Sequence, residues 1–300
     1  MSDRHQQLDR LAALLLVCLC AIWGVQQVSI KIANPGVSPL LQAGLRSVGA
    51  TLLVFLWSQA RGVRLFERDA TLGAGLAAGL LFALEFALIF WALSFTTASR
   101  GVIFLYTAPF FVALGAVWLL PSERLRPAQW MGMVLAFLGI LALFGENLLV
   151  PGGRAWIGDL MLMAAGAAWA ATTLVVRVSR LAQTAPEKTL LYQLAVSALV
   201  LPPASLLLGE AGIMRLSTEV VAALVFQTVV VASFSYLAWY WLIRHYPATK
   251  LSAFSFLTPV FGVLAGALIL GERLSAAVIV ALVLVGSGIW LANRPAPAEV

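Results

Sequence analysis

The sequence predicts an all-α integral membrane protein with ten transmembrane helices, arranged as two inverted five-helix repeats whose N-terminus and C-terminus are both cytoplasmic. Three observations support this fold class. The chain is very apolar, since 62% of its residues are hydrophobic and 11% are charged, whereas soluble domains carry about 25% charged residues. Ten long apolar runs divide the chain. Finally, one passage of the first half recurs in the second half.

Each apolar run is long enough to cross a bilayer. About 20 apolar residues span the hydrocarbon core as a helix, and lipid offers no partner for the backbone polar groups of an irregular segment. Charged residues, Pro and Gly separate the runs. The predicted spans are 11–32, 39–60, 71–94, 100–120 and 128–149 in the first half, and 156–177, 188–208, 217–243, 250–270 and 275–292 in the second. The first run lacks a small-residue cleavage pattern, so we expect a span rather than a signal peptide.

The recurring passage covers residues 100–125 and 250–274. Each copy begins with a basic residue, carries a proline nine residues later, at Pro109 or Pro259, and ends in Glu-Arg-Leu. A repeat of this length in an apolar chain is typical of transporters built from two copies of one membrane unit. The predicted domains are two five-helix repeats, at 1–150 and 151–300.

The distribution of Lys and Arg predicts the orientation. If the N-terminus is inside, the inside segments hold 13 of these residues and the outside loops hold 5. Cytoplasmic loops are enriched in Lys and Arg, so both termini are expected in the cytoplasm. Because each repeat has an odd number of helices, the second must enter the membrane from the opposite side. Such inverted repeats support alternating access about a site near the midplane.

The other polar residues argue against several functional classes. The net charge is +6, but the basic residues stand singly in short loops, which indicates membrane lipid rather than nucleic acid as a partner. Cys18 and Cys20 point to different helix faces and offer no metal pair. His5 and His245 lie away from any nucleophile or acid pair, so we expect no enzyme and no cofactor. The sequence contains no ring of charged residues of the kind that lines ion channels, which argues against a channel. It is compatible with a monomer.

The passages TTASRGVIFLYTAPFFVALGAVWLLPSERLRPAQWMG and YPATKLSAFSFLTPVFGVLAGALILGERL resemble the paired signature of the EamA-type branch of the drug/metabolite transporter superfamily. The motifs AIWG at 21–24, LLQAGLRSVGA at 40–50 and GDLMLMAAGAAWA at 158–170 extend the resemblance to about residues 10–292. It implies a ten-helix metabolite exporter of a bacterial inner membrane. Within that branch, the chain resembles the YddG-like exporters of aromatic amino acids.

Two charged residues, Arg46 and Glu85, fall well inside predicted spans. A charge at the bilayer centre costs about 2.5–3.5 kcal/mol on insertion scales, so such residues face a cavity or each other. One interpretation is an ion pair that stabilises the helix bundle. The other is that Arg46 or Glu85 borders the substrate path, where it meets the carboxylate or ammonium of an amino acid. Helix one carries Trp23 and Gln26 but no carboxylate, whereas the small multidrug relatives have a Glu there for proton exchange.

Prolines and aromatic residues complete the candidate site. Pro109 and Pro259 lie midway along their spans, where proline removes a helix hydrogen bond and bends the backbone. Trp23 and Trp169 lie mid-span at equivalent places in the two halves, away from the interfacial belt where Trp is usual. Residues three and four apart share a helix face, which groups Tyr236 with Tyr240, and Ser252 with Ser255 and Pro259. The remaining candidates are Tyr106 and Phe256.

These residues predict a pocket with aromatic walls and a few hydroxyl groups, suited to a small amphipathic solute. Small polar residues also join helices in lipid, so a packing role for them stays open. We expect an exporter of small amphipathic metabolites, foremost neutral or aromatic amino acids. The alternative is efflux of aromatic or quaternary cations, or transport of another metabolite. The Glu-Arg-Leu ends are expected to be scaffold.

Overall fold

The computed structural model describes residues 7–67, 69–92, 95–96, 98–149, 153–271 and 276–293. Within these residues the fold is all-helical, apart from one isolated antiparallel bridge between Val37 and Ile213. The predicted all-α class is therefore confirmed.

The helices of the first half are α1 (Arg10–Ala33), α2 (Pro39–Ala60), α3 (Leu72–Ala92), α4 (Ala98–Leu105), α5 (Ala108–Leu119) and α6 (Pro127–Phe144), with 3-10 turns η1 (Pro121–Glu123) and η2 (Gly145–Leu148). The second half contains α7 (Ala155–Val178), the 3-10 turn η3 (Arg180–Gln183), α8 (Pro186–Leu207), α9 (Thr218–Val225), the π-helical segment η4 (Phe226–Ser235), α10 (Tyr236–His245), α11 (Ala248–Phe254), α12 (Leu257–Leu270) and α13 (Ala277–Ala292).

Nine helical stretches of the described residues are long and apolar enough to cross a membrane, and each coincides with one of the first nine predicted spans. The tenth span corresponds to α13, a shorter apolar helix of 16 residues. Leu56, Leu80 and Leu268 are among the large apolar side chains that are exposed on the outer surfaces of the helices. An apolar exterior of this kind suits lipid, and the protein is a multi-pass membrane protein.

The two spans that contain the repeated prolines are both interrupted, where the sequence predicted a bend. Helix α4 ends at Leu105, and Pro109 lies in the first turn of α5. In the second half, α11 ends at Phe254, and Pro259 lies in the first turn of α12. Proline lacks an N–H group, and its ring clashes with the carbonyl of the residue four positions earlier, so it kinks or breaks a helix; at Pro109 and Pro259 the helix is broken.

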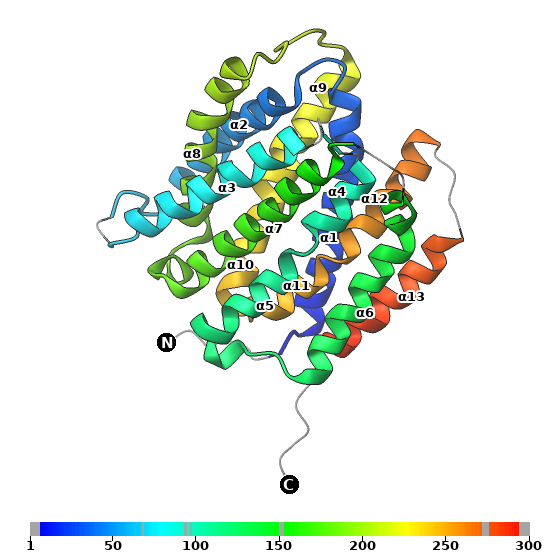
Figure 1. Cartoon of the computed structure of the whole chain (residues 1–300). Coiled ribbons are helices and arrows are strands. Elements are labelled where there is room, and N and C mark those ends of the chain that lie inside the picture. The colour runs from blue at the N-terminus through cyan, green and yellow to red at the C-terminus, as the bar shows by residue number, and fades with distance from the viewer. Residues whose placement is uncertain are drawn as a thin grey trace.

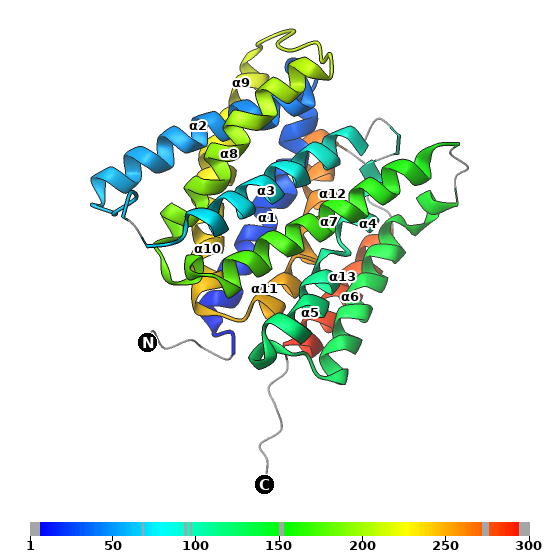
Figure 2. The same ribbon diagram turned by 60° about the vertical axis from the view of Figure 1, so that its left-hand side comes forward.

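The helices pack as an elongated bundle with a pair of helices at each edge. Figures 1 and 2 show α6 beside α13 at one edge and α2 beside α8 at the other. Between these pairs, α1 packs against α12, α7 packs against α4 and α5, and α3 packs against both α7 and α8. The inner positions are filled by buried apolar side chains such as Leu16, Met133 and Leu194.

Both ends of the described chain lie at the same end of the bundle. Three hydrogen bonds join the connections there: Tyr246 to Asp9, Ala248 to Glu123, and Gln129 to the carbonyl of Ala292. Asp9 precedes α1 and Ala292 ends α13, so the two ends share this face. We call it the terminal face; it consists of residues 7–9, 61–67, 69–71, 120–126, 179–185, 246–247 and 293. The opposite end is the distal face, formed by residues 34–38, 145–149, 153–154, 208–217 and 271.

Glu123 is the buried centre of the terminal face. Arg177 Nε donates to its Oε1 at 2.5 Å, and the backbone N–H of Ala248 donates to its Oε2 at 2.6 Å. Arg177 also donates to the carbonyl of Ile243 at 2.6 Å. The first Glu-Arg-Leu, at 123–125, therefore ties helices of the two halves together, as expected of scaffold. The second copy, at 272–274, lies outside the described residues.

Candidate functional site

A cavity of about 100 Å³ lies in the interior between helices of both halves. The first half contributes α1, α3 and the end of α4, and the second contributes α7 and α10. The lining residues are Trp23, Gln26, Gln27, Phe82, Glu85, Phe86, Ile89, Leu105, Tyr106, Trp169, Thr172, Tyr236, Trp239 and Tyr240. Most are aromatic, and among the lining residues that the structure describes Glu85 is the single charged one.

Trp23 organises one aromatic wall of the cavity. Its ring centroid lies 5.5 Å from that of Trp239, edge to face, and 6.1 Å from that of Tyr236. The indole Nε1 of Trp23 donates to Ser235 Oγ at 2.9 Å, which fixes the ring. On another wall, Tyr106 meets Trp169 edge to face at 6.0 Å. Such aromatic pairs contribute about 0.5–1.5 kcal/mol beyond the area they bury.

Tyr240 is held by a partner behind the cavity wall. Its hydroxyl donates to Gln193 Oε1 at 2.5 Å, and Gln193 Nε2 in turn donates to the carbonyl of Thr189 at 3.3 Å. Gln193 is fully buried. The tyrosine ring therefore has a fixed position, and its hydroxyl group is already occupied by the protein.

Arg46 and Glu85 are buried close to this cavity, with exposed fractions of 2% and 8%. Both belong to the described part of the chain, and there they form no ion pair with each other, so the bundle-stabilising ion pair does not hold in this structure. Instead, the guanidinium of Arg46 lies over the Phe86 ring. Its Nε and Nη2, and Oε2 of Glu85, have no hydrogen-bond partner among the described residues. Buried charged groups without partners are costly, so a bound water, a ligand or a change of conformation would stabilise them.

The helix that carries Tyr236 widens just before it reaches the cavity. Residues Phe226–Ser235 are π-helical, and Ser233 Oγ donates to the carbonyl of Thr228, five residues earlier, at 2.8 Å. In the same segment, Gln227 Nε2 donates to Gln42 Oε1 of α2 at 2.8 Å. Wide turns of this kind are rare and often occur at functional sites. The sequence predicted a regular helix here.

Several predicted site residues lie outside the cavity. Ser252 and Ser255 donate to backbone carbonyls of their own helix, at 3.0 Å and 2.7 Å. Phe256 is fully buried and packs against Phe110 and Phe137, with ring centroids 6.0 Å and 6.4 Å away. The cause is the break between α11 and α12, because the rule that residues three and four apart share a face fails where the helix stops. Neither Pro109 nor Pro259 is among the described lining residues.

Other lining residues were missed by sequence reasoning. On α3, Phe82, Phe86 and Ile89 follow the helical spacing around Glu85 and so share its face. Trp239 lies three residues after Tyr236 on α10. The spacing of these residues is visible in the sequence. In so apolar a chain, however, this spacing does not distinguish a helix face that lines a cavity from one that faces lipid. Among the described residues, no group of three His, Cys, Asp or Glu side chains is placed to hold a metal ion.

Comparisons with known proteins give a consistent result. The model of the EamA-like transporter family matches residues 10–145 and 156–294. A probable amino-acid metabolite efflux pump of Salmonella typhimurium strain LT2 is 29% identical over 296 residues, with 94% of each chain covered. An uncharacterized transporter of Archaeoglobus fulgidus is 26% identical over 250 residues, covering 83% of this chain and 85% of the relative. One crystal structure shares the fold, with a TM-score of 0.81 at 22% identity over 95% of this chain and 97% of the other.

Proposed function

Because the chain belongs to the EamA-like transporter family, and is thus a membrane transporter, we propose that it exports small amphipathic metabolites, foremost neutral and aromatic amino acids. The observation that carries the proposal is the interior cavity, which has aromatic walls from both halves and, beside it, a buried guanidinium and a buried carboxyl group with atoms that find no hydrogen-bond partner among the described residues. The relatives described as amino-acid metabolite efflux pumps support export as the direction.

The two charges match the backbone of an amino acid. Glu85 lines the cavity and presents Oε2 without a partner, which suits an ammonium group. Arg46 lies behind Phe86, and a rotation of that ring would let a substrate carboxylate reach Nε and Nη2. Hydrogen bonds to charged groups contribute about 1.5–3 kcal/mol each, more than neutral ones. A zwitterion would therefore satisfy both orphaned side chains at once.

The aromatic walls fit the rest of such a substrate. Trp23, Trp239 and Tyr236 form one wall, and Tyr106 and Trp169 form another. An aromatic side chain between them would gain stacked and edge-to-face contacts. In this scheme the polar backbone of the substrate lies toward α3 and its side chain lies toward α1, α7 and α10.

Two matching contacts support the proposal of inverted repeats at 1–150 and 151–300. Asp69, in the connection after α2, accepts from Lys188 in the first turn of α8. Glu210, in the connection after α8, accepts from the backbone N–H groups of Leu40 and Leu41 in the first turn of α2. The second helix of each proposed repeat thus receives a carboxylate from the other half, one at the terminal face and one at the distal face. Alternating access would rock these halves about the cavity.

The count of Lys and Arg supports cytoplasmic termini, and the bacterial relatives support a bacterial inner membrane as the location.

One observation favours a second candidate function. Glu85 is a carboxylate within an aromatic cavity, and aromatic rings with one acid also suit a quaternary cation. Efflux of aromatic cations is therefore the alternative.

Counterflow in proteoliposomes distinguishes the two. Vesicles loaded with unlabelled phenylalanine or tryptophan should accumulate the labelled amino acid, and vesicles loaded with an aromatic quaternary cation should not accumulate the labelled cation. Exchange of the cation without exchange of any amino acid would replace the proposal by its alternative.

A further inference from the structure

A second, composite cavity opens at the terminal face, away from the interior site. A polar pocket of about 450 Å³ is lined by residues of the α2–α3 connection, η3 and the start of α8. An apolar groove of about 710 Å³ runs from it between α2, α3 and α8. The two share Glu67, Asp69 and Lys188, so they form one continuous space with a polar end and an apolar end.

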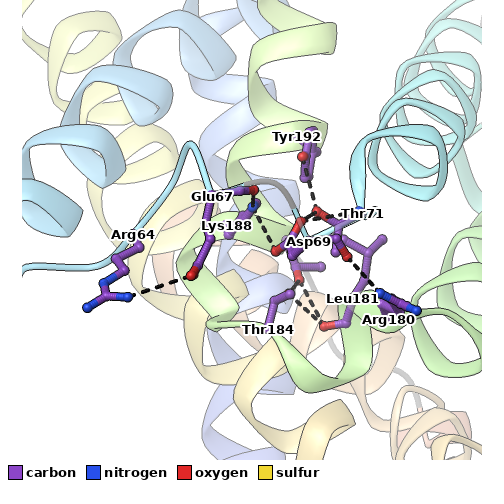
Figure 3. A network of polar contacts seen from close by, with 10 residues as sticks. Arg64, Glu67, Asp69, Thr71, Arg180, Leu181, Thr184, Lys188 and Tyr192 are labelled. Carbon is purple, nitrogen blue, oxygen red and sulfur yellow. Dashed lines mark hydrogen bonds and ion pairs between the residues drawn. The ribbon is translucent and has the colours of Figure 1, made fainter.

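The polar end carries more positive than negative side chains. Arg64, Arg180 and Lys188 line it against Glu67 and Asp69. Lys188 Nζ donates to Asp69 Oδ2 at 2.8 Å and to the carbonyl of Glu67 at 3.1 Å, so its charge is neutralised locally. Figure 3 shows Arg64 and Arg180 on opposite sides of these carboxylates. Among the described lining residues, the positive charges exceed the negative ones by one, which matches a single phosphodiester.

The helix at the pocket adds to this preference. Ala185 lines the pocket and is the N-cap residue of α8, and within the described residues it has no side-chain capping bond. The N-terminus of a helix carries a partial positive charge, which favours an anion, although α8 begins with Pro186, which has no N–H group, and carries Glu187 in its first turn. Arg64 is highly exposed, with 81% of its side chain accessible and its Nη1 at 3.6 Å from Glu67 Oε1. Such a weak surface contact leaves the guanidinium available to a ligand.

The apolar end has the dimensions of an acyl chain in one leaflet. Its wall on α8 runs from Lys188 to Leu199, which is about 16 Å of helix at roughly 1.5 Å per residue. One leaflet contributes about 15 Å to the hydrocarbon core. Phe55, Leu72 and Leu76 form the facing walls. Leu72, Leu76 and Leu199 are 61%, 44% and 76% exposed, so the groove is open to the bilayer at these residues.

We propose that this composite cavity binds one anionic glycerophospholipid, with its phosphate between Arg64 and Arg180 and one acyl chain in the groove. The lipid comes from the leaflet that the distribution of Lys and Arg predicts to be cytoplasmic, where anionic lipids are enriched. The Asp69–Lys188 contact connects the two halves of the chain at this point, so the bound lipid lies against the junction. The inference does not depend on which solute the protein transports.

Native mass spectrometry of the full-length protein, released from detergent with phosphatidylglycerol or phosphatidylcholine of identical acyl chains, tests the proposal. We expect phosphatidylglycerol to bind more tightly. Arg64→Gln with Arg180→Gln should weaken phosphatidylglycerol by about fivefold for each arginine and leave phosphatidylcholine unchanged. Ala195→Trp, which fills the groove, should weaken both lipids.

Two controls make the test decisive. Arg154→Gln removes an exposed arginine at the distal face and should leave both lipids unaffected. Glycerol 1-phosphate has the headgroup chemistry without acyl chains and should not compete. Equal binding of the two lipids to the wild-type protein would overturn the proposal. So would an equal loss in Arg154→Gln, which would indicate a general charge effect, or full competition by glycerol 1-phosphate, which would indicate a site for soluble anions.

Discussion

The guanidinium carbon of Arg46 lies 4.4 Å from the centroid of the Phe86 ring, and that ring lines the interior cavity next to Glu85. A desolvated cation–π contact is worth about 2 kcal/mol, whereas burying an ion costs several kcal/mol. The ring therefore offsets only part of the cost of burying the charge. A substrate carboxylate would offset the remaining cost of burying the Arg46 charge. Binding of a substrate in the cavity would therefore stabilise the helix bundle through Arg46 and Phe86.

Arg46→Gln tests this account. We expect the KM for phenylalanine in counterflow to rise by about 10- to 100-fold, because a charge-assisted hydrogen bond of roughly 1.5–3 kcal/mol is lost. Arg46→Lys keeps the charge and should lose less. Thermal unfolding of the purified variant serves as the control. If Arg46→Gln no longer folds, while detergent-solubilised wild type does, Arg46 stabilises the bundle and the substrate role fails.

Glu85→Gln tests proton coupling. Glu85 is a buried carboxyl group that faces the cavity, so it is placed to exchange a proton for a substrate ammonium. We expect an imposed pH gradient to increase accumulation of labelled phenylalanine in wild-type proteoliposomes but not in those with Glu85→Gln. Glu146→Gln, on the distal face, is the control. If Glu85→Gln responds to the pH gradient as strongly as the wild type does, Glu85 has no role in proton coupling.

Gly24 holds α1 against α12. A Cβ atom at Gly24 would lie 2.7 Å from the backbone nitrogen of Gly262 and 2.7 Å from the carbonyl carbon of Phe261, and backbone atoms cannot yield. Gly24→Ala should therefore destabilise the protein by about 1–3 kcal/mol and lower the thermal midpoint. At Gly286 no described atom lies within 4 Å of an added Cβ, so Gly286→Ala should be tolerated. Equal midpoints for the two variants would show that α1 and α12 are not packed this closely.

Asp69 predicts a pH dependence at the terminal face. Hydrogen bonds from Lys188, and then from Thr71, lower the pKa of Asp69 from 3.8 to about 2. A carboxyl group whose pKa is depressed by folding stabilises the native state above its unfolded pKa and loses that effect as the pH falls toward the folded pKa. Wild type should thus be more stable than Asp69→Asn at pH 7, and the difference should shrink between about pH 4 and pH 2. A difference that stays constant over this range would contradict the assignment.

The sequence predicted the spans and a bend at each repeated proline because both follow from local chemistry. Long apolar runs must be helices in lipid, and a proline inside such a run kinks or breaks the helix; the sequence did not distinguish the breaks at Pro109 and Pro259 from the continuous helix α8, which contains Pro202 and Pro203. Trp23, Trp169 and Glu85, which the sequence analysis selected because their mid-span positions are unusual for their residue types, all line one cavity.

The remainder depended on how helices face one another. Ser252 and Ser255 were expected in the pocket, but their hydroxyl groups bond to their own helix where α11 ends. Phe82 and Phe86 were missed because an apolar stripe on a membrane helix can face a cavity, a neighbouring helix or lipid. The sequence pattern is the same in all three cases. The π-helical widening before Tyr236 has no local signal, since it needs no glycine or proline.

The central claim is that the cavity recognises the ammonium and carboxylate groups of one amino acid together. Inhibition of phenylalanine counterflow by unlabelled phenylalanine, phenethylamine and 3-phenylpropionate tests it most directly, because the last two compounds each lack one of the charged groups. The account predicts strong inhibition by phenylalanine and weak inhibition by both analogues. Inhibition by phenethylamine as strong as that by phenylalanine would contradict it and would identify a cation site built on Glu85 alone.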